Sequence, residues 1–136
     1  MINIILFFLF VFIRNNYINN IINMENLTID TFKEKIFDYP KSDKFIGTKP
    51  AIIDFYADWC KPCHMIEPIL EELDAEYPDI DFYKLNTEEQ FEVAAVFGIR
   101  NIPAVLIIPL TDAPKMLIGA HSKGKFKEAI KDTLKM

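Results

Sequence analysis

The chain has 136 residues, of which 51% are hydrophobic and 26% charged, a composition that suits one globular domain with a core and leaves too little chain for two. Its formal net charge of −5 argues against a nucleic-acid partner, which would require a basic surface. The two cysteines cannot build a disulfide scaffold. A tetrahedral zinc site would also need both histidines of the chain, and one of them directly follows a cysteine, which is poor geometry for a shared site. We therefore expect no metal.

Residues 1–23 differ in composition from the rest of the chain. They are mostly isoleucine, asparagine and phenylalanine, and they contain no lysine or acidic residue. The apolar run from Ile4 to Ile13 has about the length of a signal-peptide core, but at about 1.5 Å per residue a helix of this length is too short to span a bilayer. No basic segment precedes the run, and residues 14–23 contain no alanine, glycine or serine at which a signal peptidase would cut.

Three interpretations of residues 1–23 therefore stay open. In the first, translation starts at Met24 and the preceding residues are upstream sequence read through in error. The second is a secretory signal, and the third is an uncleaved membrane anchor. The signal-peptide criteria favour the first, which places the protein in the cytoplasm; the other two place it in the periplasm or at a membrane. In each case we expect residues 24–136 to form the folded domain.

The first elements of that domain are a helix and a strand. Thr28 offers an N-cap, and a loop at residues 39–43 ends the helix that follows it. The inward face of this helix is expected to contain Phe32, Ile36 and Phe37. Residues 51–56, Ala-Ile-Ile-Asp-Phe-Tyr, form an apolar run typical of a buried strand.

A second helix is predicted from the cysteine pair to about Tyr77. Its inward stripe, at i, i+3 and i+4 spacing, consists of Met65, Ile66, Ile69, Leu70 and Leu73. A strand at residues 80–85 follows, and then a short helix at residues 88–97. We expect that helix to end before Gly98 and to turn Phe91, Ala94 and Ala95 inward.

The last part of the chain predicts two strands and a helix. The strands cover residues 105–108 and 115–118, and Ser122 offers the N-cap of the final helix. Phe126, Ile130 and Leu134 lie on one face of it. Strands separated by helices indicate parallel pairs, whereas the short connection at residues 109–114 indicates an antiparallel pair. The sequence thus predicts an α/β fold, with a mixed central β-sheet and helices on both faces.

Both cysteines lie in the turn between the first strand and the second helix, in the sequence Asp-Trp-Cys-Lys-Pro-Cys-His at residues 58–64. Cys60 is near the helix N-terminus, where unpaired backbone N–H groups and the helix dipole stabilise a thiolate. A cysteine pair in this position is suited to cycle between dithiol and disulfide. The segment from Phe55 to Cys63 closely resembles the active-site segment of the thioredoxin family, and the resemblance covers about residues 26–136.

The resemblance implies a thiol–disulfide oxidoreductase with the thioredoxin fold. Cys60, expected to face solvent, would attack a protein disulfide, and the less accessible Cys63 would resolve the mixed disulfide and release the reduced substrate. The electrons travel through the cysteine pair, so no bound cofactor is expected. Thioredoxin reductase would be the electron donor, disulfide-containing proteins the substrates, and cell redox homeostasis the role. We expect a monomer.

Two further side chains are candidates for assisting this exchange. Asp54 is an acid within an apolar strand, and burial there should raise its pKa toward the range of a proton acceptor. The matching aspartate of thioredoxins assists deprotonation of the second cysteine, which is Cys63 here. Lys84 matches a lysine that neighbours this aspartate, although an exposed strand lysine is an equally simple interpretation. His64 and His121 are expected at the surface, without a catalytic role.

The turn between the cysteines contains one residue that departs from the family. Pro62 stiffens the turn and suits a first helical position, because it has no N–H to leave unpaired. Lys61 occupies a position that is most often glycine in thioredoxins. A cation beside Cys60 favours the thiolate and should make the couple somewhat more oxidising. The alternative is a solvated lysine that contacts acidic partners.

The resemblance also predicts a substrate-binding surface around Cys60. Pro103 matches the cis-proline of the family, and the backbone of the preceding Ile102 would pair with an extended substrate peptide. Trp59 and Gly119, together with Ile102, would complete a shallow apolar surface. Two alternative functions use the same residues: an exported or membrane-tethered oxidoreductase, and a binding module that holds a partner in this groove without turnover.

Overall fold

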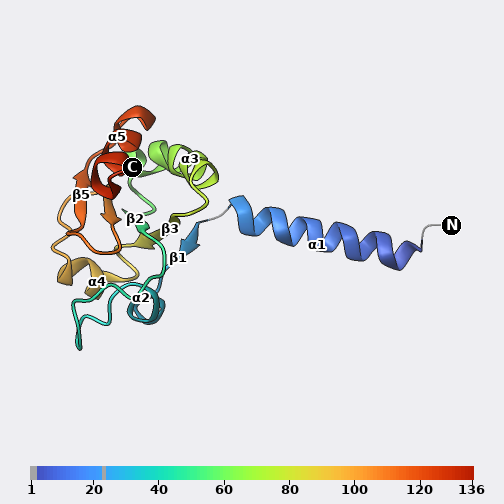
Figure 1. Cartoon of the computed structure of the whole chain (residues 1–136), viewed down its shortest axis with the longest axis horizontal. Coiled ribbons are helices and arrows are strands. Elements are labelled where there is room, and N and C mark those ends of the chain that lie inside the picture. The colour runs from blue at the N-terminus through green and yellow to red at the C-terminus, as the bar shows by residue number, and fades with distance from the viewer. Residues whose placement is uncertain (1–2, 23) are drawn as a thin grey trace.

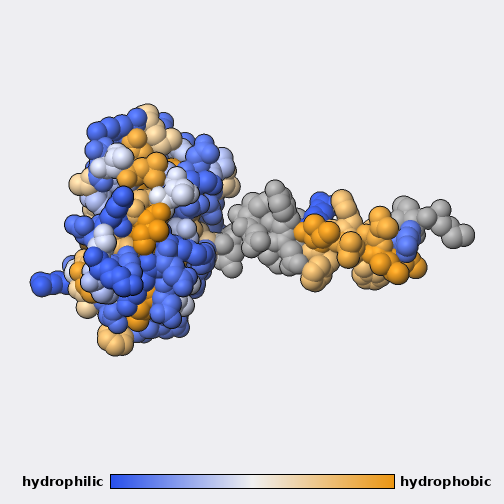
Figure 2. Space-filling view, turned by 60° about the horizontal axis from the view of Figure 1, so that its bottom comes forward, coloured by the Kyte–Doolittle hydropathy of each residue, from blue (hydrophilic) through white to orange (hydrophobic). Residues whose placement is uncertain are grey.

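A computed structural model describes residues 3–22 and 24–136. Figure 1 shows a body formed by the later helices and strands, from which α1 (Ile4–Ile22) extends away. The first half of α1 presents apolar side chains to solvent, visible as an orange surface in Figure 2. Within the described ranges, no helix is at once long and apolar enough to cross a bilayer. Met24, by contrast, is buried in the core of the body.

Five strands of the described chain form one mixed sheet in the order β1-β3-β2-β4-β5. Their bounds are Glu25–Asn26 for β1, Ala51–Tyr56 for β2, Asp81–Asn86 for β3, Ala104–Ile108 for β4 and Lys115–Ile118 for β5. β3 runs parallel to both β1 and β2, whereas β4 runs antiparallel to β2 and to β5. The predicted mixed sheet is confirmed. The sequence pattern missed β1, which has only two residues, both exposed and polar.

The antiparallel pairing of β4 with β2 differs from the expectation that a helix between strands makes them parallel. The connecting helix, α4 (Phe91–Val96), has six residues, about 9 Å at 1.5 Å per residue. A strand of five or six residues is about 17–20 Å long, so α4 is shorter than a strand and does not by itself span the sheet as a crossover helix would. The chain therefore enters β4 from the same end at which it left β3.

Helices cover both faces of the sheet, as predicted. α3 (Lys61–Glu76) and α5 (Lys123–Leu134) pack on one face, and α2 (Ile29–Lys35) and α4 pack on the other. Side chains of β2 alternate between the two layers, with Ile52 on the α3 side and Ile53 on the α2 side. The expected N-caps are present: the side chains of Thr28 and Ser122 accept hydrogen bonds from backbone N–H groups of the first turns of α2 and α5.

Some predicted helix faces differ from the structure. The side chain of Asn86 accepts hydrogen bonds from the N–H groups of Glu88 and Glu89 and holds a turn there, so α4 begins three residues later than expected. Val93 and Ala94 are its buried residues, whereas Phe91 is 71% exposed and Ala95 is also exposed. Both of these were predicted to face inward.

Met65 was also predicted to be in the core and is 64% exposed. The buried face of α3 follows Ile66, Leu70 and Leu73, at i, i+4 and i+7 spacing. One residue along a helix is a rotation of about 100°, which turns Met65 away from the sheet. In α2, the helix ends at Lys35 with Ile36 as its C-cap, although the side chain of Ile36 stays buried as expected.

The difference between the two faces of α3 gives a stability test. Leu70 is 1% exposed, so Leu70→Ala should leave a cavity and lower the free energy of unfolding by about 3 kcal/mol. Met65→Ala, on the exposed face of the same helix, should change it by less than about 0.5 kcal/mol. Urea unfolding followed by circular dichroism measures both. Equal losses for the two variants would contradict the assignment of the buried face.

Candidate active site

The cysteine pair lies where β2 ends and α3 begins. Cys60 and Cys63 are joined by a disulfide, with their Cα atoms 5.3 Å apart. Cys60 is the N-cap of α3, and its sulfur accepts a hydrogen bond from the backbone N–H of Cys63 at 3.3 Å. Pro62 lies in the first turn, where its missing N–H leaves no bond unmade. Cys60 thus occupies the position at which a helix stabilises negative charge on sulfur.

In this disulfide form, neither cysteine faces solvent. Both residues are 2% exposed, because Ala57, Tyr56 and Ile102 pack around them. The expectation that Cys60 points to solvent is therefore wrong for the oxidised protein. The contact with Ile102 depends on the chain segment before β4, which places a residue distant in sequence against the redox turn.

Asp54 lies in the middle of β2 and is 2% exposed. Its neighbours across the sheet are Val105 on β4 and Lys84 on β3. Among the described residues, its Oδ1 atom has no hydrogen-bond partner. Burial raises the pKa of Asp54 to about 7, the negative charge of Glu67 acts in the same direction, and Lys84 opposes them. A carboxyl group with this pKa can exchange a proton near neutral pH.

Lys84 is the direct partner of Asp54 in the pairing of β2 with β3, so the two residues lie side by side in the sheet. Its ammonium group, however, does not bond to Asp54. The Nζ atom of Lys84 donates a hydrogen bond to Oε1 of Glu67 at 2.9 Å and lies 5.6 Å from the centre of the Tyr56 ring. Burial acts to lower the pKa of Lys84, but the hydrogen bond and charge of Glu67, with smaller contributions from Tyr56 and Glu71, together raise it.

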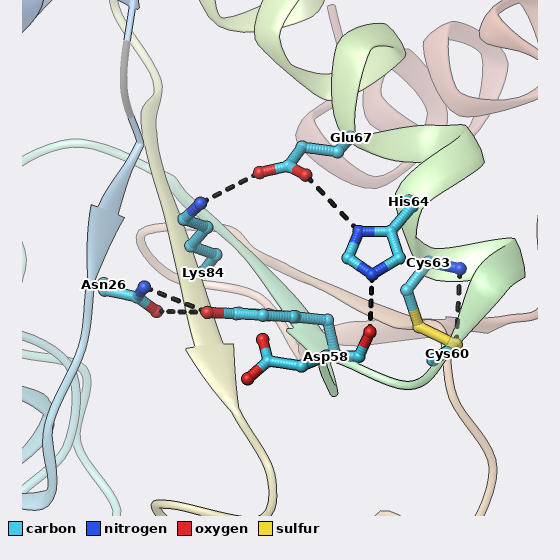
Figure 3. A network of polar contacts seen from close by, with 8 residues as sticks. Asn26, Asp58, Cys60, Cys63, His64, Glu67 and Lys84 are labelled. Carbon is cyan, nitrogen blue, oxygen red and sulfur yellow. Dashed lines mark hydrogen bonds and ion pairs between the residues drawn. A yellow bond between two sulfur atoms is a disulfide. The ribbon is translucent and has the colours of Figure 1, made fainter.

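Figure 3 shows this polar network beside the disulfide. The second oxygen of Glu67 lies 3.9 Å from Nδ1 of His64, and Nε2 of His64 donates to the backbone carbonyl of Asp58 at 2.7 Å. His64 is at the surface, as expected, but it has a defined partner. Sequence analysis missed Glu67, although it lies three residues after His64 on a helix and would have been placed on the same side.

The residues predicted to bind substrate lie around the turn. Trp59 is 69% exposed, and its indole N–H donates to the carboxylate of Glu88. The peptide bond between Ile102 and Pro103 is cis, as the resemblance implied. The backbone N–H of Gly119 donates to the carbonyl of Pro103 at 2.8 Å, which ties β5 to this loop.

Gly119 has a φ of +97°, a conformation that favours glycine. No atom of the described chain lies within 4 Å of a Cβ built at Gly119, so backbone conformation rather than crowding explains the glycine. Lys61 is exposed on the first turn of α3. No group of three or more histidine, cysteine, aspartate or glutamate side chains in the described ranges is arranged to hold a metal ion.

The geometry supports one kind of chemistry. A disulfide is placed at a helix N-terminus, a buried carboxyl group with a pKa near neutrality lies on the strand that leads into the cysteine turn, and an exposed tryptophan precedes Cys60. Groups of these kinds can support thiolate formation, proton exchange and peptide binding respectively, which together are the requirements of thiol–disulfide exchange.

Comparison with known proteins agrees with this site. The thioredoxin family model matches residues 23–132. A thioredoxin of Borreliella burgdorferi is 43% identical over 111 residues, which cover 79% of this chain and 94% of that protein. Thioredoxin 1 of Nostoc sp. is 34% identical over 109 residues, again 79% of this chain and 94% of that protein.

A solved structure extends the similarity to the fold. Mitochondrial thioredoxin 3 of Saccharomyces cerevisiae, in its oxidized form, superposes with a TM-score of 0.63 at 28% identity, over 80% of this chain and 94% of that one. The chain belongs to the thioredoxin family and is a thiol–disulfide oxidoreductase whose redox-active centre is the Cys60–Cys63 disulfide.

Proposed function

We propose that the protein reduces disulfides of other proteins in the cytoplasm, with Cys60 as the attacking thiol, Cys63 as the resolving thiol and Asp54 as the proton acceptor. The observation that carries this proposal is the buried Asp54 carboxyl on β2, the strand that leads into the cysteine turn, with its pKa raised to about 7. A disulfide with a purely structural role does not require a buried carboxyl group, because ionisation of that group lowers the stability of the fold.

The reaction proceeds in two exchanges. The Cys60 thiolate attacks one sulfur of the substrate disulfide, and the other substrate sulfur leaves as a thiolate that takes up a proton. The Cys63 thiol then gives its proton to Asp54, and its sulfur attacks Cys60 and releases the second substrate thiolate. The substrate gains two electrons, and the protein is left with the Cys60–Cys63 disulfide.

The remaining groups bind the substrate. Trp59 and Ile102 offer apolar contacts beside Cys60, and the backbone of Ile102 offers pairing to an extended peptide. Gly119 and Pro103 shape this edge, and Lys61 adds a positive charge for acidic partners. We further propose that thioredoxin reductase restores the dithiol, that the protein acts as a monomer, and that no other cofactor takes part.

The cysteine roles can be separated by two serine variants. Cys63→Ser should attack substrate but leave it attached, so a covalent adduct through Cys60 accumulates. Cys60→Ser should form no adduct, and both variants should lose insulin reduction with dithiothreitol as the electron source. Mass spectrometry detects the adduct. A protein that works as a non-catalytic binding module would retain its function as Cys60→Ser, and that result would contradict the proposal.

The proton role of Asp54 predicts a pH-dependent stability. The folded pKa of about 7 lies above the value of 3.8 for a free aspartate, so the native state of the wild type loses stability as pH rises between these values. Asp54→Asn removes this loss. The gain in free energy of unfolding of oxidised Asp54→Asn over the wild type should be about 2 to 3 kcal/mol larger at pH 8 than at pH 5. Urea unfolding at the two pH values measures it.

The same Asp54→Asn variant should slow the resolving step. At pH 7 the mixed disulfide should persist for longer than in the wild type, because Cys63 has lost its proton acceptor. A stabilisation that is equal at pH 5 and pH 8 would contradict the raised pKa, and an unchanged resolving rate would contradict the proton role.

We propose that residues 24–136 are the functional unit and that residues 1–23 are not needed for exchange. Support comes from the burial of Met24 in the core and from a family match that begins at residue 23. The N-terminus of the protein purified from its own cells should be Met24 or Glu25, as determined by mass spectrometry. A chain that begins at Met1, or one trimmed between Arg14 and Met24, would favour membrane association or export instead.

A further inference from the structure

The side chain of Glu67 lies on α3 one turn beyond Cys63, and its polar partners are Lys84 and His64. Its two oxygens face different groups: Oε1 accepts a hydrogen bond from Lys84 at 2.9 Å, and Oε2 lies 3.9 Å from Nδ1 of His64. Figure 3 shows Glu67 between these two side chains, at the edge of the redox turn. The glutamate side chain is 34% exposed and that of Lys84 only 16%, so the pair is partly shielded from water.

From its position in the sheet, Lys84 would be expected to form an ion pair with Asp54 rather than with Glu67. Lys84 is in register with Asp54 on the adjacent strand, and registered residues of parallel strands project to the same face of the sheet. Asp54 has an oxygen without a hydrogen-bond partner in the described chain, yet the ammonium group of Lys84 bonds to Glu67 instead. The lysine nearest to the buried carboxyl is therefore held by another carboxylate.

Besides Lys84 and Glu67, the elements around Asp54 place few charged side chains near it. β4 places Val105 opposite it, and on β2 the next residue on the same face is Tyr56, whose hydroxyl pairs with Asn26. On α3, Cys60 and Cys63 are joined as a disulfide, and His64 is held by the carbonyl of Asp58.

The remaining charges of the neighbouring helices act elsewhere. Glu71 acts on Lys84 rather than directly on Asp54. The lysines of α5 that reach α3, Lys123 and Lys127, pair with Glu72 and Glu76 in its second half. Among the residues that the structure describes, Lys84 and Glu67 are thus the two charges that act on Asp54, and they act in opposite directions.

We propose that Glu67 is a positioning residue for proton transfer: it holds Lys84 away from Asp54 and so keeps Asp54 able to accept the Cys63 proton near neutral pH. This inference rests on the proton role of Asp54 proposed above. Glu67 exchanges no proton and no electron itself, and it acts only through the place of the lysine and through its own charge.

The consequence for the reaction follows from matching proton affinities. A free cysteine thiol has a pKa of about 8.5, and a carboxylate paired with a lysine has one well below its free value. Transfer from the thiol to such a carboxylate is strongly uphill. Because Glu67 binds Lys84, the Asp54 carboxylate remains a stronger base. Its pKa then lies closer to that of the Cys63 thiol.

The test is Glu67→Gln in the full chain, with Glu72→Gln as the matched control. Glu72 is on the same helix, is 62% exposed at its side chain and pairs with Lys123, so its variant makes the same change in net charge far from the redox turn. The carboxyl carbon of Asp54 is titrated by NMR in the oxidised proteins. In Glu67→Gln the pKa of Asp54 should fall by about one pH unit, as an approaching opposite charge produces, and in Glu72→Gln it should not move.

A second pair of variants tests the route through Lys84. In a Lys84→Met background no ammonium group can approach Asp54, so Glu67→Gln should lower the pKa of Asp54 by less than half as much as it does in the wild type. Equal falls in both backgrounds, or no fall in Glu67→Gln, would overturn the proposal. NMR spectra of the variants show directly whether each is folded.

Kinetics separate this inference from the proton role itself. In Glu67→Gln the acidic limb of the pH profile of the resolving step should move to lower pH together with the pKa of Asp54. The titration alone decides whether Glu67 positions Lys84. If the pKa moves and the kinetic limb does not, the inference about Glu67 stands, and the role of Asp54 as the proton acceptor is the part that fails.

Discussion

The structure depends on one costly burial, that of the Asp54 carboxyl. A carboxylate removed from water loses its hydration, and without a hydrogen-bond partner it prefers to keep its proton. β2 lies at the centre of the sheet between β3 and β4, and α3 covers the face on which Asp54 points, so water is excluded from three sides. The apolar layers on both faces supply the stability that allows such a group to persist. The burial that destabilises the Asp54 carboxylate also raises its pKa to near neutrality, which is the property that the proposed function requires.

α3 divides into two parts with different tasks. Its first turn holds the disulfide, and its backbone N–H groups favour negative charge on Cys60. Beyond Glu67 the helix serves packing: Leu70 and Leu73 fill the core, and glutamates on the outer side bond to lysines of α5. The exposed ion pairs contribute little each, but the buried leucines fix the angle at which the first turn meets the end of β2. Rigid packing in one half therefore positions the chemistry in the other.

Much of this arrangement was predictable because it is local in sequence. The apolar run of β2, the cysteine turn and the helix stripe follow one another within the chain, and the N-caps at Thr28 and Ser122 are short-range signals. Asp54 could be recognised as buried from its apolar neighbours alone. Other features were not predicted: the side chain of Asn86 holds a turn that delays the start of α4, and Met65 lies just outside a stripe that pattern alone cannot delimit. The partnership of Glu67 with Lys84 joins a helix to a strand, and no spacing in the sequence encodes it.

The two strands at the borders of the sheet have a consequence for the behaviour of the protein at high concentration. An open border exposes unpaired backbone groups that another chain can extend, which is the route to fibrous aggregates. Here β1 has two residues and β5 has four, the latter beginning with the exposed Lys115. Borders this short, one of them with a positive charge, offer few bonds to an incoming strand. The fold thus restricts backbone pairing at the outer strands, whereas a substrate peptide is proposed to pair at the loop before β4.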